Sequence, residues 1–307
     1  MSRGDDQRDE PKIGDDAPPW DGQGLPPVAR LRMQRYAASP VRSSLLNVAG
    51  HVGAEHVGLT PVGEVMGSCV QHIGFYGFGG CGYGGYGAYG RFGTATVTSG
   101  SSAGWVGFGA YVDALNHGWD TARNRMLEEA RSMGADGVVG LRYTAQPIGN
   151  NNREFVLLGT AVRASGRRHV TTPFTTPLGG QDVAKLLLAG WVPAGFLLGI
   201  SVAVRHDDWV TQSQARSWTN TEISGYTELI HHVRGDARNQ LAHSTARTGA
   251  DGSIIHDMRL NVWEMEQGEN HRDHVAEATI AGTAIARFHR GAAAPTRTRT
   301  MLPLRRL

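Results

Sequence analysis

Apolar residues in the middle of the chain recur with the period of a helix. Between residues 112 and 133 they are separated by steps of three or four, which places them on one buried face: Val112, Leu115, Trp119, Ala122, Met126, Ala130 and Met133. Gly134 stands where this helix ends, because glycine adopts the left-handed cap conformation without steric cost. Two β-branched runs follow, at 138–143 and 155–162, around a Pro/Gly/Asn-rich stretch at 146–153. They predict a β-hairpin.

The same succession returns further along the chain. A second helical stripe ends at Gly249 and comprises Tyr226, Leu229, Val233, Ala237 and Leu241. The letters Gly-Ala-Asp-Gly occupy 134–137 and again 249–252, a shift of 249 − 134 = 115 residues. Strands are expected at 253–263 and 274–288, around a loop at 267–271.

Further landmarks repeat on both sides of the helix. Gly-Thr-Ala at 159–161 returns at 282–284, so the second hairpin is longer by 282 − 159 − 115 = 8 residues. Upstream, three residues return with a shift of 193 − 61 = 132: Pro61, Gly63 and Gly67 correspond to Pro193, Gly195 and Gly199. Recurrence at this density indicates a duplicated domain. The sequence therefore predicts an α+β fold of two tandem β-α-β-β units, each with a preceding short helix.

These motifs resemble the YbjQ-like family, which carries the label of a heavy-metal-binding domain. The residues that carry the resemblance are Pro61 to Gly67, Tyr111, Gly134 to Gly140 and Gly159 to Val162, with Gly195 to Val202, Tyr226, Gly249 to Gly252 and Gly282 to Ala284 in the second unit. The resemblance covers about residues 41–165 and 181–290. It implies dodecin-subunit-like units that assemble into rings, commonly pentamers, and a metal ion by label only. It implies no catalytic residues, and the second unit departs from the pattern at Ser253 to His256.

The composition divides the chain into five segments. Residues 1–40 are rich in Asp, Arg, Pro and Gly and are expected to be disordered. The first unit, 41–165, contains a Gly/aromatic-rich insert at 74–93, and a Thr/Pro-rich linker at 166–180 precedes the second unit at 181–290. Residues 291–307 form an arginine-bearing tail that is also expected to be disordered.

Charge and cysteine usage exclude some classes of function. The formal net charge is +2, so no strong field favours nucleic acid. Only Cys69 and Cys81 are present, which excludes a disulfide framework and favours a cytoplasmic protein. The apolar run at 183–204 is long enough to span a bilayer. Lys185 and Pro193 interrupt it, so a short helix, a turn and a buried strand are expected, without a membrane partner.

The Gly/aromatic insert contains the spacing Gly77-x-Gly79-x-x-Gly82, but it does not predict a dinucleotide site. Such a site needs a helix that opens at the glycines. Here the glycines continue to Gly93, so a helix cannot begin among them. A loop that is flexible or that contacts a partner is the favoured interpretation.

Metal-binding candidates are few despite 13 histidines. The spacing of Cys69 and Cys81 differs from that of a zinc finger. His271 and His274, with Asp273 between them, could hold a metal ion in the second hairpin loop. The alternative is a solvated polar turn, and the identity of any cofactor remains open.

One constellation of polar residues occurs in both units. Tyr111, Asp113 and His117 correspond to Tyr226, Glu228 and His232, all with a shift of 115. The carboxylate and the imidazole lie at i and i+4 on one face of the helix, where they could bind a ligand in a cleft between the units. The alternative is an exposed ion pair beside a tyrosine packed at the edge of the domain.

Three hypotheses of function follow from the sequence. The first is an oligomerising, non-enzymatic protein that binds a heavy-metal ion or a small ligand. The second is a scaffold that binds proteins through the Gly/aromatic loop. The third is an enzyme that uses the Tyr/carboxylate/His set. A homo-oligomer is expected, because each unit leaves a sheet edge or face that its twin or another chain must cover.

Overall fold

A computed structural model describes residues 20–73, 98–99, 109–149, 151–166, 170–266 and 272–288. In these ranges the helices are α1 (Pro27–Ala38), α2 (Val48–His56), α3 (Gly109–Ser132), α4 (Gly180–Leu188), α5 (Trp209–Ala215) and α6 (Ser224–Arg247). The strands are β1 (Leu59–His72), β2 (Thr98–Ser99), β3 (Gly137–Pro147), β4 (Asn152–Ala164), β5 (Phe174–Thr175), β6 (Trp191–His206), β7 (Gly252–Glu266) and β8 (Arg272–Arg287). The mixed α+β class expected from the sequence is confirmed.

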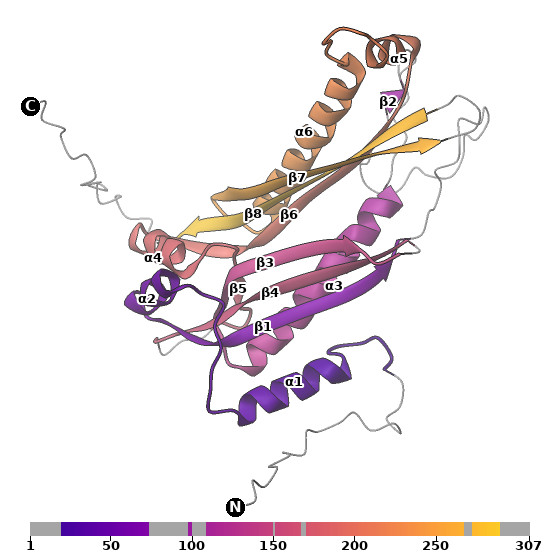
Figure 1. Cartoon of the computed structure of the whole chain (residues 1–307). Coiled ribbons are helices and arrows are strands. Elements are labelled where there is room, and N and C mark those ends of the chain that lie inside the picture. Colours follow the sequence, from indigo (N-terminus) through magenta and orange to yellow (C-terminus); the bar gives the residue numbers. More distant parts are fainter. Residues whose placement is uncertain are drawn as a thin grey trace, which may run out of the picture.

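Two four-stranded sheets form the centre of the molecule (Figure 1). The first has the order β1-β4-β3-β5, and the second has the order β2-β6-β8-β7. The long strands of each sheet pair antiparallel, whereas the two-residue strands β5 and β2 join parallel to β3 and β6. Helix α3 packs on β1 and β4, and helix α6 packs on β6 and β8.

Each long helix approaches its sheet most closely at a glycine. A Cβ atom on Gly67 of β1 would lie 1.8 Å from the carbonyl oxygen of Ala122 in α3. A Cβ atom on Gly199 of β6 would lie 2.0 Å from the carbonyl oxygen of Ala237 in α6. Backbone therefore meets backbone at both crossings, and any side chain would push the helix away from the sheet.

The Gly-Ala-Asp-Gly motif joins the end of each long helix to the end of its hairpin. Gly134 and Gly249 have φ values of 64° and 71°, so each adopts the left-handed conformation after its helix. The Asp136 carboxylate accepts hydrogen bonds from the backbone N–H groups of Ala164 and Val170, at 2.8 and 3.1 Å. Asp251 accepts one from Arg287 N–H at 2.8 Å. The motif is thus a structural clamp in both places.

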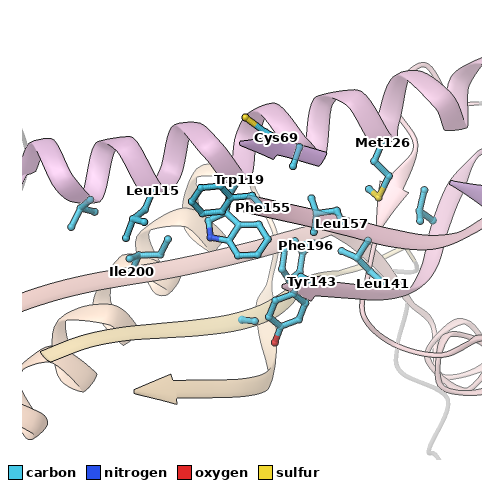
Figure 2. Close-up of a cluster of buried hydrophobic side chains, with 14 of the residues drawn as sticks. Cys69, Leu115, Trp119, Met126, Leu141, Tyr143, Phe155, Leu157, Phe196 and Ile200 are labelled. Atoms are coloured by element: carbon cyan, nitrogen blue, oxygen red, sulfur yellow. The ribbon is translucent and has the colours of Figure 1, made fainter. Parts of the chain in front are cut away.

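The two sheets share one hydrophobic core. The face of β6 opposite α6 contributes Phe196 and Ile200, which join a cluster of side chains from α3, β3 and β4 (Figure 2). The Tyr143 ring lies 5.1 Å from the Phe196 ring, and Trp119 meets Phe155 edge-on at the same distance. Burial of aromatic surface from both halves holds the two sheets together.

The structure corrects the disorder expected for residues 1–40, because residues 27–38 form α1. The helix has no buried residue, so its hydrophobic pattern did not predict it. It is held through Arg32, which donates hydrogen bonds to the carboxylate of Glu129 and to Met66 O. Burial raises the pKa of Glu129, although Met66 N–H and Arg32 act in the opposite direction. Residues 1–19 lie outside the described ranges.

The expected linker at 166–180 is also partly ordered, because Phe174 and Thr175 form β5 beside β3. The insert at 74–93 and the tail at 291–307 lie outside the described residues. In the part of the chain that is described, no helix combines the length and the apolar character needed to cross a bilayer. The apolar run at 183–204 folds as the end of α4, a turn and β6.

Candidate functional site

The structure separates the predicted Tyr/carboxylate/His set of the first half. Asp113 and His117 are both exposed on α3, whereas Tyr111 is partly buried and points toward the second sheet. The Tyr111 hydroxyl donates a hydrogen bond to Glu277 Oε2 on β8 at 3.0 Å. The partner of the tyrosine therefore belongs to the other half of the chain and not to the predicted set.

Tyr111 belongs to a buried polar cluster between the two halves. Arg153 at the start of β4 donates to both carboxylate oxygens of Glu277, at 3.0 and 3.1 Å, and to the Tyr111 hydroxyl at 3.2 Å. Burial raises the pKa of Tyr111, and the Glu277 charge raises it further, so the hydroxyl stays protonated and donates. Burial opposes the charge on Arg153, but Glu277 raises its pKa overall. The cluster is a charged link between the sheets.

The second predicted set is also divided. The Tyr226 hydroxyl donates to Asp207 Oδ2 at 3.1 Å, and its ring lies 4.1 Å from the His274 ring. Glu228 accepts a hydrogen bond from Arg205 at 2.8 Å. His232 is half-buried, and burial lowers its pKa although Asp236 opposes the effect.

His274, a weak metal candidate, lies in a hydrogen-bonded network. Its Nδ1 is 3.0 Å from Asp207 Oδ1, and its Nε2 is 3.3 Å from Glu264 Oε1. Both ring nitrogens therefore face carboxylates, which orient the imidazole between β6, β7 and β8. The other candidate, His271, lies outside the described residues.

A metal-binding cluster is not found in the described ranges: no group of three or more His, Cys, Asp or Glu side chains is arranged to hold an ion there. Cys69 is buried, and burial raises the pKa of its thiol even though Arg125 lowers it. A raised pKa keeps the sulfur protonated and makes it a poor metal ligand. Cys81 is not among the described residues.

A cleft of about 460 Å³ lies between the two long helices. Its floor is apolar and its rim carries charges of both signs. The lining comprises Val112, Asp113, Asn116, Trp119, Asp120 and Arg123 from α3, Leu157, Phe196, Leu197, Leu198 and Ile200 from the sheets, and Gln240, Ser244, Arg247 and Thr248 from α6 and its end. This volume is in the range of small-molecule sites. Asp113 is the one residue of the predicted sets that lines it.

His256 makes the stability of the protein sensitive to acid. Its Nε2 lies 3.0 Å from Thr283 Oγ1, which in turn lies 2.8 Å from Thr176 Oγ1. Burial lowers the pKa of His256 below 6.5, although Asp182 acts in the opposite direction. As the pH falls below about 6.5, the unfolded chain binds a proton that the folded chain resists, so the free energy of unfolding decreases. This loss levels off below the folded-state pKa.

We expect His256→Gln to make the free energy of unfolding less dependent on pH between 6.5 and 5 than in the unmodified protein. Urea denaturation at a series of pH values measures this dependence. His231→Gln is the control, because His231 is exposed on α6. An unchanged pH dependence in His256→Gln would contradict the assignment.

Part of the chain matches the model of a known protein family. Residues 102–165 match the family model described as "Putative heavy-metal-binding". The matched range contains α3, β3 and β4. The resemblance stated from the motifs is thus confirmed for this part of the chain.

Several UPF0145 proteins match over a similarly short span. The chain is 42% identical over 53 residues to the UPF0145 protein of Halorubrum lacusprofundi, which is 17% of this chain and 51% of that protein. It is 43% identical over 54 residues to a UPF0145 protein of Clostridium novyi, 18% of this chain and 52% of that protein. The match spans about half the length of these relatives.

A longer match is with the Encapsulin nanocompartment protein of Mycobacterium tuberculosis. The two chains are 28% identical over 276 residues, which is 87% of this chain and 93% of the relative. The similarity therefore includes both halves of the molecule.

Sequence reasoning missed the residues that make the buried polar clusters. Arg153 ends the Pro/Gly/Asn-rich stretch at 146–153 that predicts a loop, and Asp207 belongs to none of the candidate sets. Glu277 carried the one available indication, because it is a lone acidic residue within the apolar run 275–281. A charge inside such a run requires a buried partner.

Proposed function

We propose that this protein is a self-associating, non-enzymatic binding module of the cytoplasm, built from two YbjQ-like units, and that it acts as a component of a nanocompartment assembly. The observation that carries the proposal is the similarity to the encapsulin nanocompartment protein over 87% of this chain and 93% of that relative. The similarity therefore extends over both sheets of this protein and is not limited to a shared fragment.

Three structural parallels support a second copy of the unit within the chain. Strands β1, β4 and β3 have the order of β6, β8 and β7. Each long helix crosses its sheet at a glycine, Gly67 or Gly199. Each Gly-Ala-Asp-Gly aspartate, Asp136 or Asp251, clamps the end of the hairpin strand. These features concern backbone geometry, which changes more slowly than surface side chains.

Open strands support self-association. β7 is the last strand of its sheet, and two of its apolar side chains are about half-exposed, Ile255 at 49% and Val262 at 48%. On the first sheet, Val70 of β1 is 57% exposed. An open sheet edge presents unpaired backbone groups that can pair with another chain, and the exposed apolar side chains beside it would be buried by that contact.

A second candidate function is the binding of a small ligand in the cleft between α3 and α6. Its apolar floor and mixed-charge rim suit a small amphipathic molecule. A heavy-metal version of this function, which the family description suggests, would have to use residues outside the described ranges. The scaffold hypothesis rests on the insert at 74–93. The enzyme hypothesis rests on the Tyr/carboxylate/His set, whose tyrosine hydroxyls donate to Glu277 and Asp207.

Native mass spectrometry of protein purified without a tag tests the proposal. We expect a complex of several copies that persists at low micromolar concentration, and elemental analysis of the same sample without stoichiometric metal. A monomer at all concentrations up to 100 times that level would refute self-association. Any bound non-protein mass in the spectrum would favour the ligand function.

A further inference from the structure

We propose that the open face of the first sheet docks on the α6 side of the second sheet of another copy, and that this contact repeats the packing of the two halves within one chain. The inference rests on the proposed function, since it specifies the surfaces through which the protein would self-associate. The partner is a second copy of this chain.

The first observation is a contrast in burial between corresponding positions. On the face of the second sheet that packs against the first half, Val202 is 0% exposed and Ala281 is 1% exposed. Their counterparts in the first sheet are Val70 (202 − 132 = 70) and Leu158 (281 − 123 = 158). Val70 is 57% exposed, and Leu158 is partly exposed. The same face is thus covered in one half and open in the other.

The pairing register supports this correspondence. Val70 lies opposite Glu154 in the first sheet, and Val202 lies opposite Glu277 in the second. Glu277 is buried and binds Arg153 of the other half. Glu154 is instead partly exposed and accepts a hydrogen bond from Gln146 of the neighbouring strand at 2.8 Å. Glu154 thus corresponds in position to Glu277, but no second half of the chain packs against it.

The described elements cover only one end of this open face. Leu45 N–H donates to Thr160 Oγ1 at 3.0 Å, and Ser43 lies 3.5 Å from Glu64, so residues 43–46 run over the end near α2. The other end, around Val70 and Glu154, has no cover in the described ranges. Val70 is 57% exposed on this face, and a second copy that docks there would bury it.

The second observation concerns the receiving surface. Within the chain, the second sheet rests against one flank of α3 that includes Val112, Leu115 and Trp119, all of which are buried. With the shift of 115, the same flank of α6 comprises Thr227, Ile230 and Arg234. All three are partly exposed. The buried stripe of α6 faces its own sheet, so the flank with Thr227, Ile230 and Arg234 is free to contact another copy.

Arg234 adds an electrostatic argument. Its Nε atom is buried and has no hydrogen-bond acceptor among the described residues. A buried donor without an acceptor is costly, and an acidic surface that docks there would relieve the cost.

The two surfaces differ, so their contact is heterologous. Each copy would present its open face to one neighbour and its α6 flank to another. Such a contact generates a closed ring or a helical filament, whereas a two-fold dimer uses the same surface twice. Along the assembly, the contact between the two halves of one chain would then alternate with the contact between two chains.

Two charge substitutions test the inference by blocking one surface each. Val70→Arg blocks the open face, and Ile230→Arg blocks the α6 flank. We expect each variant alone to be monomeric in native mass spectrometry. A mixture of equal amounts should form a complex of two copies, because each variant retains the surface that the other lacks. Val52→Arg is the control, since Val52 is 60% exposed on α2 away from both surfaces, and it should assemble fully.

The outcomes separate this inference from the proposed function. If the unmodified protein is monomeric, the proposed function fails with it. If the unmodified protein assembles and Val70→Arg assembles equally, only the docking surfaces are wrong. Two monomeric variants that do not combine when mixed would also overturn the inference, because each variant retains the surface that the other lacks. Circular dichroism checks folding, and Thr227→Arg replaces Ile230→Arg if the latter does not fold.

Discussion

Replacing Gly199 with alanine is expected to reduce the free energy of unfolding by about 3 kcal/mol, near the upper end of the usual cost of overpacking. The added methyl group would lie 2.0 Å from the Ala237 carbonyl oxygen and 2.8 Å from Leu241 N. Both atoms belong to the backbone of α6, so no rotation of a side chain can relieve the overlap. The helix must move away from β6, and the buried contacts of its apolar stripe must loosen with it.

Gly195→Ala provides a matched control on the same strand. Nothing lies within 4 Å of a Cβ atom at Gly195. Urea denaturation should therefore show a change of less than about 1 kcal/mol for Gly195→Ala. Equal effects at the two glycines would show that close approach of α6 is not the reason for glycine at position 199.

Glu277→Ala is expected to destabilise the protein by about 3–5 kcal/mol, the usual cost of removing one partner from a buried ion pair. The Glu277 side chain is 6% exposed, and Arg153 is 20% exposed. Without the carboxylate, Arg153 keeps its charge in a partly buried site, and the Tyr111 hydroxyl loses its acceptor. The free energy of unfolding from urea denaturation measures the loss.

Two comparisons make this result specific. Replacement of both partners, Arg153→Met with Glu277→Leu, should recover much of the loss, because an apolar pair leaves no buried charge. Asp182→Ala breaks an exposed ion pair with Lys185 and should cost less than about 1 kcal/mol. A double replacement as unstable as Glu277→Ala would indicate that packing or the unpaired Tyr111 hydroxyl, and not the uncompensated charge, causes the effect.

The sequence predicted the helices and strands that bury one face within their own half of the chain, because such burial gives a regular spacing of apolar residues. The stripe from Val112 to Met133 and the later stripe around Val233 both became long helices that end at a glycine. The paired strands followed for the same reason. In each case the local pattern of apolar residues is enough to predict the element, because a helix and a strand each bury side chains at regular steps.

The packing of one half on the other could not be predicted in this way. Glu277 and Arg153 are 277 − 153 = 124 positions apart, and no spacing rule connects them. The predicted set of Tyr111, Asp113 and His117, like its counterpart, lies on one helix, and its spacing does not indicate a partner on another element. In the structure the hydroxyls of Tyr111 and Tyr226 donate to Glu277 and Asp207. Helix α1 was missed because it has no buried apolar stripe; Arg32 and the Tyr36 ring, which lies over Gly63, attach it to β1.

The attachment of α1 to β1 through Arg32 also protects an edge of the first sheet. Arg32 and the Glu129 carboxylate meet at β1, where Met66 N–H donates to Glu129 at 2.9 Å and Arg32 donates to Met66 O. Both backbone polar groups of Met66 at this sheet edge are therefore bound by side chains of the same molecule. A protein trimmed to begin at Val41 would lose Arg32, which would expose Met66 O, leave the Glu129 carboxylate without its counter-ion and open this edge to strand addition by other chains.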